Sequence, residues 1–215
     1  MTRLEFDNGP LLVRESLFSM TGAVTEAILA ATTALLDQNL QAAHATASLE
    51  QQLDDNRQLI EHSTLQLLAR DRQEASELRM LISAIKISAL CWRMGVLAHH
   101  IGMAARHCYP APAIPEELSG IFRQMGDAAA RITDDARVTL LDAECLEVED
   151  DTLNGLRRAL FRALLDNRSH DIETAVNVAL LARYYERLVD HAVALIQSVI
   201  FKVTGTKLDV GPQVG

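Results

Sequence analysis

Aromatic residues, prolines and glycines are all scarce in this sequence. Of its 215 residues only 4% are aromatic, and there are five prolines and ten glycines. Chains with many strands and turns use these residue types often, whereas Ala and Leu, which are abundant here, favour helices. The composition therefore predicts a predominantly helical protein.

Cysteine and positive charge are also in short supply. Cys91, Cys108 and Cys145 are an odd number without close pairing, and no CxxC pair supports a zinc ribbon. This usage is typical of reduced thiols in a cytoplasmic protein. The 20 Lys and Arg residues are outnumbered by 29 Asp and Glu, and the resulting net charge of −9 argues against a nucleic-acid binder.

Targeting signals and catalytic motifs are missing as well. The N-terminal segment lacks the apolar core of a secretory signal, and no uninterrupted run approaches the roughly 20 apolar residues of a membrane span. We therefore expect membrane association only through partners. The sequence contains no GxxxxGK[ST], GxGxxG, GxSxG or HExxH motif, and no Glu-x-x-His pair of the kind that di-iron bundles use. We expect no enzymatic turnover.

Apolar residues recur at helical spacing in six segments, which predict helices over about 10–36, 40–69, 74–107, 115–142, 146–166 and 171–204. Three of the five prolines fall between residues 110 and 115, the clearest boundary in the chain. We accordingly expect a first three-helix repeat over 10–108, a Pro-rich linker over 109–114, a second repeat over 115–205, and a C-terminal tail over 206–215.

The two halves resemble each other in sequence. The stretch MTGAVTEAILAATTALLD from Met20 matches MGDAAARITDDARVTLLD from Met125, 105 residues later. WRMGVLAHHI from Trp92 matches ERLVDHAVAL from Glu186, 94 residues later. Two copies of one unit explain this shared order. The expected fold is all-α, with six helices in two tandem three-helix bundles.

Two carboxylates stand out in the last predicted helix, within ARYYERLVDHAV. Glu186 and Asp190 are four residues apart, so both lie on one helical face at the edge of a wide apolar stripe. Arg183 and Arg187 can pair with them, which gives a solvated salt-bridging rim. The alternative is a metal-ligating edge.

A metal site would need more oxygen ligands, and an acidic run can supply them. Glu147, Glu149, Asp150 and Asp151 are a solvated helix start in the simplest interpretation. If the fifth and sixth predicted helices pack antiparallel, Asp150 is the expected third ligand beside Glu186 and Asp190. Oxygen-only sites suit Mg²⁺, Mn²⁺ or iron, and less often Zn²⁺.

These residues resemble the PhoU family of phosphate-uptake regulators, whose signature is two three-helix repeats with an E(D)xxxD motif in the third helix of each. Glu186 and Asp190 stand at the motif positions, and the resemblance extends from about Leu12 to Gly205. In the first copy, Trp92 and Val96 stand where the family places its acids, while Arg93, Gly95 and Ala98 match.

The resemblance implies metal binding in the second half only, because Trp92 and Val96 offer no oxygen ligand. Asn154 stands where an acid is common in the family, so weak binding of a divalent, iron or zinc ion, or none, is expected. Trp92 is left with two roles, a core or rim aromatic or an anchor at an interface.

For function, the resemblance implies a cytoplasmic, homodimeric negative regulator of phosphate uptake and of the phosphate-starvation response. Its partners would be the ATPase subunit of the phosphate ABC transporter and a phosphate-sensing histidine kinase. The alternatives are a metal-binding helical protein and a helical scaffold without a phosphate role.

Overall fold

The computed structural model describes residues 9–69, 74–141 and 172–204, and every regular element in these ranges is helical. The elements are α2 (Gly9–Asp37), α3 (Leu40–Leu68), α4 (Ala75–Cys108), the short 3₁₀-helix η1 (Glu116–Leu118), α5 (Ser119–Leu141) and α7 (Ile172–Thr204). The all-α prediction is confirmed, and these five long helices lie within a few residues of the predicted ones. The helix expected over 146–166 lies outside the described residues.

Local sequence explains where the helices begin and end. Between α2 and α3 the chain turns at Gln38, whose φ of 52° lies in the left-handed region. The Asn39 side chain then caps α3 by accepting a hydrogen bond from the backbone N–H of Ala42 at 3.0 Å. After α4, the prolines interrupt helix formation until Pro115, which directly precedes η1.

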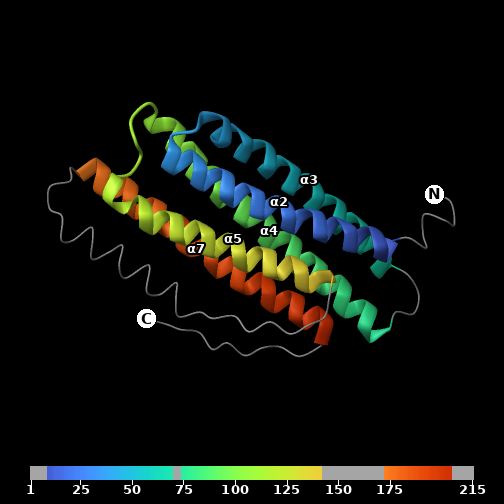
Figure 1. Ribbon diagram of the computed structural model, residues 1–215. Helices are drawn as coiled ribbons and strands as arrows, with labels where there is room; N and C mark the ends of the chain where they lie inside the picture. The colour runs from blue at the N-terminus through green and yellow to red at the C-terminus, as the bar shows by residue number, and fades with distance from the viewer. Residues whose placement is uncertain (1–8, 70–73, 142–171, 205–215) are drawn as a thin grey trace.

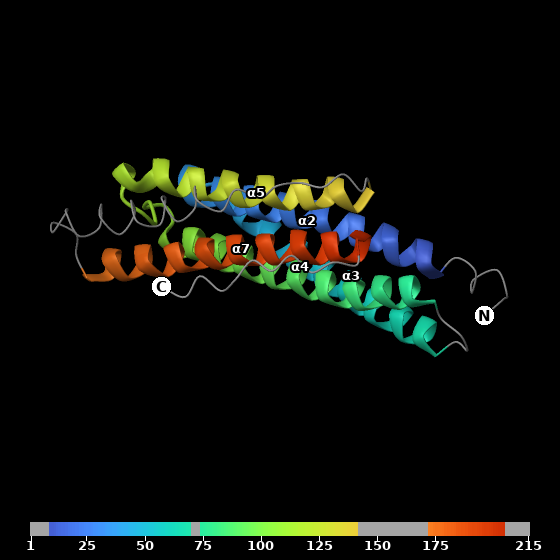
Figure 2. The same ribbon diagram turned by 90° about the horizontal axis from the view of Figure 1, so that it is seen from below.

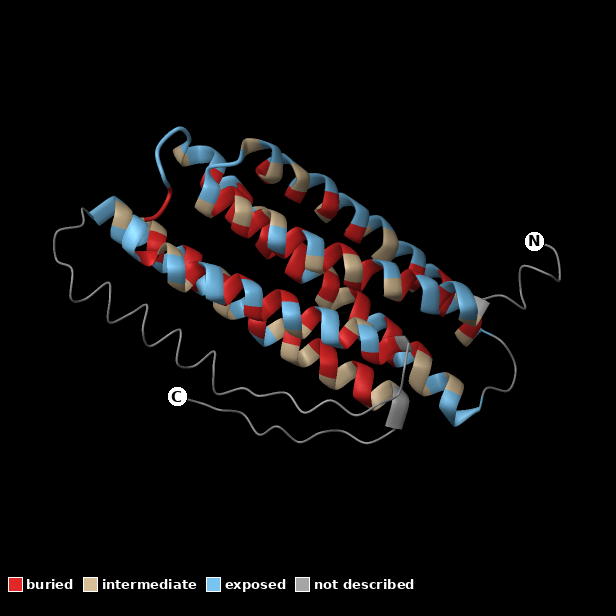
Figure 3. Cartoon of the chain, in the orientation of Figure 1, coloured by how far each residue is buried: buried red, intermediate tan, exposed pale blue. Residues whose placement is uncertain are grey.

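The five helices pack lengthwise against one another (Figures 1 and 2). Helices α2, α3 and α4 pack against one another, α5 packs against α2 and α7, and α7 packs against α4 and α5. Buried residues lie on the inner sides of all five helices (Figure 3). The helices of the second half therefore lie directly on those of the first half, and the described residues form one continuous apolar core.

Helix α4 approaches α3 closely because its α3-facing side carries small residues. They recur at spacings of three and four and are all buried: Ala84, Ser88, Cys91, Gly95, Ala98, Gly102 and Ala105. A Cβ atom added at Gly95 would collide with the Leu53 side chain, and one added at Gly102 would collide with Thr46, both on α3. The absence of a side chain at these two glycines sets the distance between the helices.

A buried hydrogen bond joins the two halves. The Tyr185 hydroxyl of α7 lies 2.9 Å from Oγ1 of Thr32 on α2. Because the Thr32 hydroxyl donates to the carbonyl of Ile28 at 2.9 Å, Tyr185 is the donor to Thr32. Gly126 of α5 lies against Thr32 as well, in a contact too close for a Cβ atom. Residues of α2, α5 and α7 thus meet at a single point of the core.

Helices α2 and α4 are each long and apolar enough to cross a membrane by length and composition alone. In both, half or more of the most apolar window is buried inside the bundle, at 56% and 50%. Core helices of soluble proteins share this property, so the hydropathy of α2 and α4 is explained by burial.

Candidate metal-binding face of helix α7

Glu186 and Asp190 lie on the rim of α7, as the spacing predicts. The preceding Tyr185 and the intervening Leu188 are fully buried and fix the orientation of the helix. The Glu186 side chain is 22% exposed and Asp190 is exposed. Both carboxylates therefore stand at the border between core and solvent.

An arginine already binds one of these carboxylates. Nη1 of Arg183 donates to Oε2 of Glu186 at 2.6 Å. This hydrogen bond and the charge of Glu186, with a smaller contribution from Asp190, raise the pKa of the Arg183 guanidinium. Since Arg183 is 62% exposed, such a pair contributes at most about 1 kcal/mol to stability. The pair has the geometry that the salt-bridging interpretation predicts.

The described residues do not complete a metal site on their own. A hard cation takes about six to eight oxygen ligands, some of them water, and Glu186 and Asp190 supply two side chains. Within residues 9–69, 74–141 and 172–204, no group of three His, Cys, Asp or Glu side chains is placed to hold a metal ion. Asp150 and the acidic run around it lie outside these ranges, so the metal site stays a prediction.

The corresponding face of α4 has a different chemistry. Trp92 and Val96 are half-buried there, and the Arg57 guanidinium of α3 lies over the Trp92 ring with its Cζ 5.1 Å from the centroid. This distance fits a cation–π contact, which stabilises by about 0.5–1 kcal/mol at an exposed site. Trp92 is thus one wall of a contact between α3 and α4.

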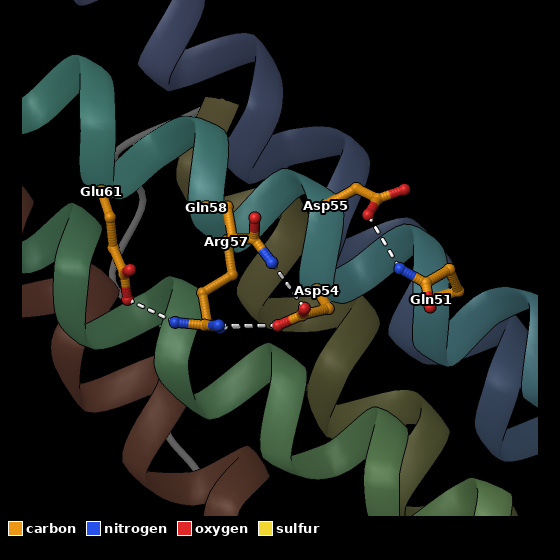
Figure 4. A network of polar contacts seen from close by, with 6 residues as sticks. All are labelled: Gln51, Asp54, Asp55, Arg57, Gln58 and Glu61. Atoms are coloured by element: carbon orange, nitrogen blue, oxygen red, sulfur yellow. Dashed lines mark hydrogen bonds and ion pairs between the residues drawn. The ribbon is translucent and has the colours of Figure 1, made fainter.

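Two carboxylates of α3 hold Arg57 in place (Figure 4). Nη2 of Arg57 donates to Oδ1 of Asp54 and Nη1 donates to Oε1 of Glu61, both at 2.7 Å. The bond from Arg57 lowers the pKa of Asp54, and Gln58 adds a further hydrogen bond at 2.7 Å. The Arg57 guanidinium therefore balances the negative charges of Asp54 and Glu61.

Arg57 was not among the residues that the sequence singles out. The sequence does indicate that Arg57 can form ion pairs within its own helix. Asp54 and Glu61 lie three residues before it and four residues after it, and helical side chains meet at these spacings. What the sequence lacks is the register between α3 and α4, which places Arg57 above Trp92.

Helix α4 also carries an outward-facing apolar stripe, hereafter the α4 stripe. Its members recur at spacings of four, three and seven along the helix: Leu78, Ile82, Ile85, Ala89, Trp92, Val96 and Met103. Four of them are large and exposed, with Leu78 and Ile82 at 42%, Ile85 at 36% and Met103 at 45%. At that spacing the whole set faces one direction, and contiguous exposed apolar surface of this kind marks interaction sites.

Helices α4 and α7 enclose a cleft of about 470 Å³ beside the end of the α4 stripe. Met103 belongs to its wall, together with Leu180 and Tyr184 of α7. Leu180 is half exposed, at 50%.

Comparison with known proteins gives relatives that all carry the name PhoU. The sequence model of the PhoU domain matches residues 17–105, which contain α3 and most of α2 and α4. The chain is 38% identical over 197 residues to the phosphate-specific transport system accessory protein PhoU homolog 2 of Mycobacterium tuberculosis, covering 89% of this chain and 92% of that protein. It is 35% identical over 198 residues to PhoU homolog 1 of Mycobacterium leprae, covering 89% of each.

Solved structures share the fold. PhoU from Pseudomonas aeruginosa superposes with a TM-score of 0.77 at 23% identity, over 94% of this chain and all of that one. The phosphate transport system regulatory protein PhoU from Streptococcus pneumoniae gives 0.78 at 19% identity, over 95% of this chain and all of that one. With relatives at 35–38% identity over nearly its whole length, the chain belongs to the PhoU family.

Proposed function

We propose that this protein is a negative regulator of phosphate uptake and of the phosphate-starvation response. It acts as an adaptor between the phosphate ABC transporter and a phosphate-sensing histidine kinase. Relatives at 35–38% identity are named accessory proteins of the phosphate-specific transport system, which supports a role beside the transporter. The proposal includes a cytoplasmic location, a homodimer and the absence of enzymatic turnover.

The α4 stripe is the observation that carries the adaptor role. Leu78, Ile82 and Ile85 stay exposed although α4 packs against α2, α3 and α7, so burial among the described residues does not explain them. We assign the α4 stripe to the ATPase subunit of the transporter, because the relatives are named accessory proteins of that transport system. Trp92 and the nearby Arg57 are of the residue types that dominate binding energy at interfaces.

A pull-down with the transporter ATPase tests this assignment. Ile82→Asp places a charge in the α4 stripe at a side chain that is 42% exposed, so it leaves the core intact. We expect loss of ATPase binding, together with derepressed phosphate uptake and phosphatase expression when the variant replaces the wild type in a deletion strain. Leu29→Asp is the matched control, since Leu29 on α2 is 45% exposed and lies outside the α4 stripe.

The outcomes separate the candidate occupants of the α4 stripe. If Ile82→Asp binds the ATPase as the wild type does but loses the sensor kinase, the assignment to the ATPase is wrong. If only the dimer dissociates, as light scattering would show, the α4 stripe is the dimer interface. If a deletion strain regulates phosphate uptake normally, the protein is a scaffold without a phosphate role.

We also propose that any bound metal lies in the second half, at Glu186, Asp190 and Asp150. This proposal rests on the carboxylate pair at the rim of α7. Arg183 competes with a metal ion for Glu186, because it already donates a hydrogen bond to that carboxylate. Elemental analysis of the wild type against a Glu186→Ala and Asp190→Ala double variant tests it. Equal metal content in the two proteins would remove these residues as ligands.

The tandem arrangement of two three-helix bundles is part of the proposal too. It is supported by the mutual packing of α2, α3 and α4 and by the sequence repeat. An experimental structure that includes residues 142–171 tests it, since a helix packed against α5 and α7 would complete the second bundle.

A further inference from the structure

The seam between α4 and α7 brings basic residues of the two halves together. The helices pack against each other and run in opposite directions (Figure 2). Their register is given by His100 of α4 and Tyr184 of α7, whose ring centroids are 5.4 Å apart. Two helical turns, or seven residues, back along α4 from His100 lead to Arg93, and seven residues forward along α7 from Tyr184 lead to His191. Arg93 and His191 therefore face each other across the seam.

Arg187 lies one turn before His191 on the same side of α7. The charges of both Arg187 and Arg93 act on the His191 imidazole and, together with the larger effect of burial, lower its pKa. Asp190 is turned about 100° away from His191 around the helix, toward the rim. Two guanidinium groups thus create a positive potential at the imidazole, in a protein whose net charge is −9.

The hydrogen-bonding capacity of this cluster is unused among the described residues. The His191 side chain is half-buried, and its Nε2 atom is buried without a hydrogen-bond partner there. Arg93 and Arg187 are exposed, and neither forms an ion pair with a carboxylate in that part of the chain. A buried polar atom without a partner is costly, and a bound water or ion is the usual explanation.

The internal repeat shows that pairing within the motif does not explain Arg93. Arg93 and Arg187 occupy equivalent positions of the two copies, 94 residues apart. In the second copy the arginine follows Glu186 and precedes Asp190, whereas in the first copy both carboxylate positions hold apolar residues, Trp92 and Val96. Arg93 is present even though the first copy has no acid at the motif positions.

We propose that Arg93, Arg187 and His191 form a binding site for a phosphate-type tetrahedral oxyanion in the seam between α4 and α7. The guanidinium groups of Arg93 on α4 and Arg187 on α7 supply charge and paired N–H donors, and the buried Nε2–H of His191 is the third donor. The site goes beyond the adaptor role, because an anion can bind here whether or not the α4 stripe contacts a transporter.

Calorimetric titration of the full-length protein with inorganic phosphate tests the site. We expect saturable one-site binding that Arg93→Gln and Arg187→Gln each weaken about tenfold or more, as the loss of a charge-assisted hydrogen bond predicts. Arg131→Gln is the matched control, because Arg131 is an exposed arginine on α5 and its loss changes the net charge equally. Thermal melts verify that all variants are folded.

Two further measurements sharpen the result. His191→Phe keeps an aromatic ring but removes Nε2, and we expect it to weaken phosphate binding while leaving the melting curve close to that of the wild type. Titration with glycerol phosphate distinguishes the source of the ligand. Tighter binding of the monoester points to a phosphoryl group on a larger molecule, whereas tighter binding of inorganic phosphate points to the free ion, and both results support the site.

The inference is overturned if phosphate does not bind, if chloride displaces it at equal concentration, or if Arg131→Gln weakens it as much as Arg93→Gln does. Each of these results would leave general attraction of anions or a bound water as the explanation of the cluster. None of them affects the adaptor role, which the pull-down with the transporter ATPase tests separately.

Discussion

Helices α4 and α7 match each other in sequence at an offset of 94 residues, yet the matching exposed or half-buried positions differ in chemistry. On α7 the motif positions hold Glu186 and Asp190, and Arg183 is bonded to Glu186. On α4 the same positions hold Trp92 and Val96, which continue an apolar stripe. Outward positions of a packed helix carry few constraints from the core, so one scaffold can present carboxylates in one half and an apolar contact surface in the other.

The buried faces of the two helices also differ, in the volume of their side chains. Gly95 and Gly102 of α4 correspond to Val189 and Ile196 of α7, 94 residues later. All four are buried, but the glycines admit α3 at close range while the larger residues fill the space around α7. Adding atoms should therefore destabilise α4, and removing atoms should destabilise α7.

The largest expected effect is at Ile196, which is 1% exposed. Ile196→Ala should lower the free energy of unfolding by about 2–5 kcal/mol, through lost burial and the cavity that remains. Urea denaturation followed by circular dichroism measures it, with Val138→Ala on α5 as the control because Val138 is 55% exposed. A loss no greater than that of the control would show that α7 is loosely packed at this point.

Gly102→Ala should cost less, about 1–3 kcal/mol, because it overpacks the contact with α3. The new Cβ would lie 2.5 Å from Oγ1 of Thr46, a β-branched residue whose hydroxyl is already bonded to the carbonyl of Ala43 at 2.7 Å. Gly120→Ala is the control, since a Cβ there meets nothing within 4 Å and alanine is the better helix former. A Gly102→Ala protein as stable as wild type would mean that α3 can move away freely.

Tyr185→Phe removes the hydrogen bond that joins α7 to α2 and should cost about 1 kcal/mol. The effect is modest because Thr32 keeps its own bond to the carbonyl of Ile28. Tyr184→Phe, one residue earlier, is the comparison, because Tyr184 is half-buried at the α4 seam and makes a ring contact with His100 rather than a bond to Thr32. Thermal melts of the two variants should differ, and equal melting temperatures would contradict a stabilising role for the buried bond.

The smallest effect belongs to Arg57→Gln, below about 1 kcal/mol, since the ion pairs it removes join side chains of one helix that remain partly exposed to solvent. The pKa of Asp54 is lowered in the native state, so the pair stabilises the fold at neutral pH and this contribution disappears as the pH falls through the lowered value. In an NMR titration, the pKa of Asp54 should be lower in wild type than in the variant, because the variant lacks the hydrogen bond from Arg57. Arg131→Gln should leave it unchanged.

The helices themselves follow from the sequence because their signals are local. Apolar periodicity, the Asn39 cap and the prolines around 110–115 act within a few residues, and the structure begins and ends its helices close to these signals. The same holds for Glu186 and Asp190, whose placement on the rim of α7 depends only on helical geometry and on which neighbours are apolar.

Tertiary structure alone decided which distant side chains meet. Arg57 lies over Trp92, Tyr185 donates to a threonine 153 positions away, and Arg93 faces His191. Each pairing depends on the register and rotation of two packed helices, which many small contacts set together. No single residue encodes that register, so the sequence placed the carboxylates of α7, and only the packed bundle revealed the arginine over Trp92 and the basic seam between α4 and α7.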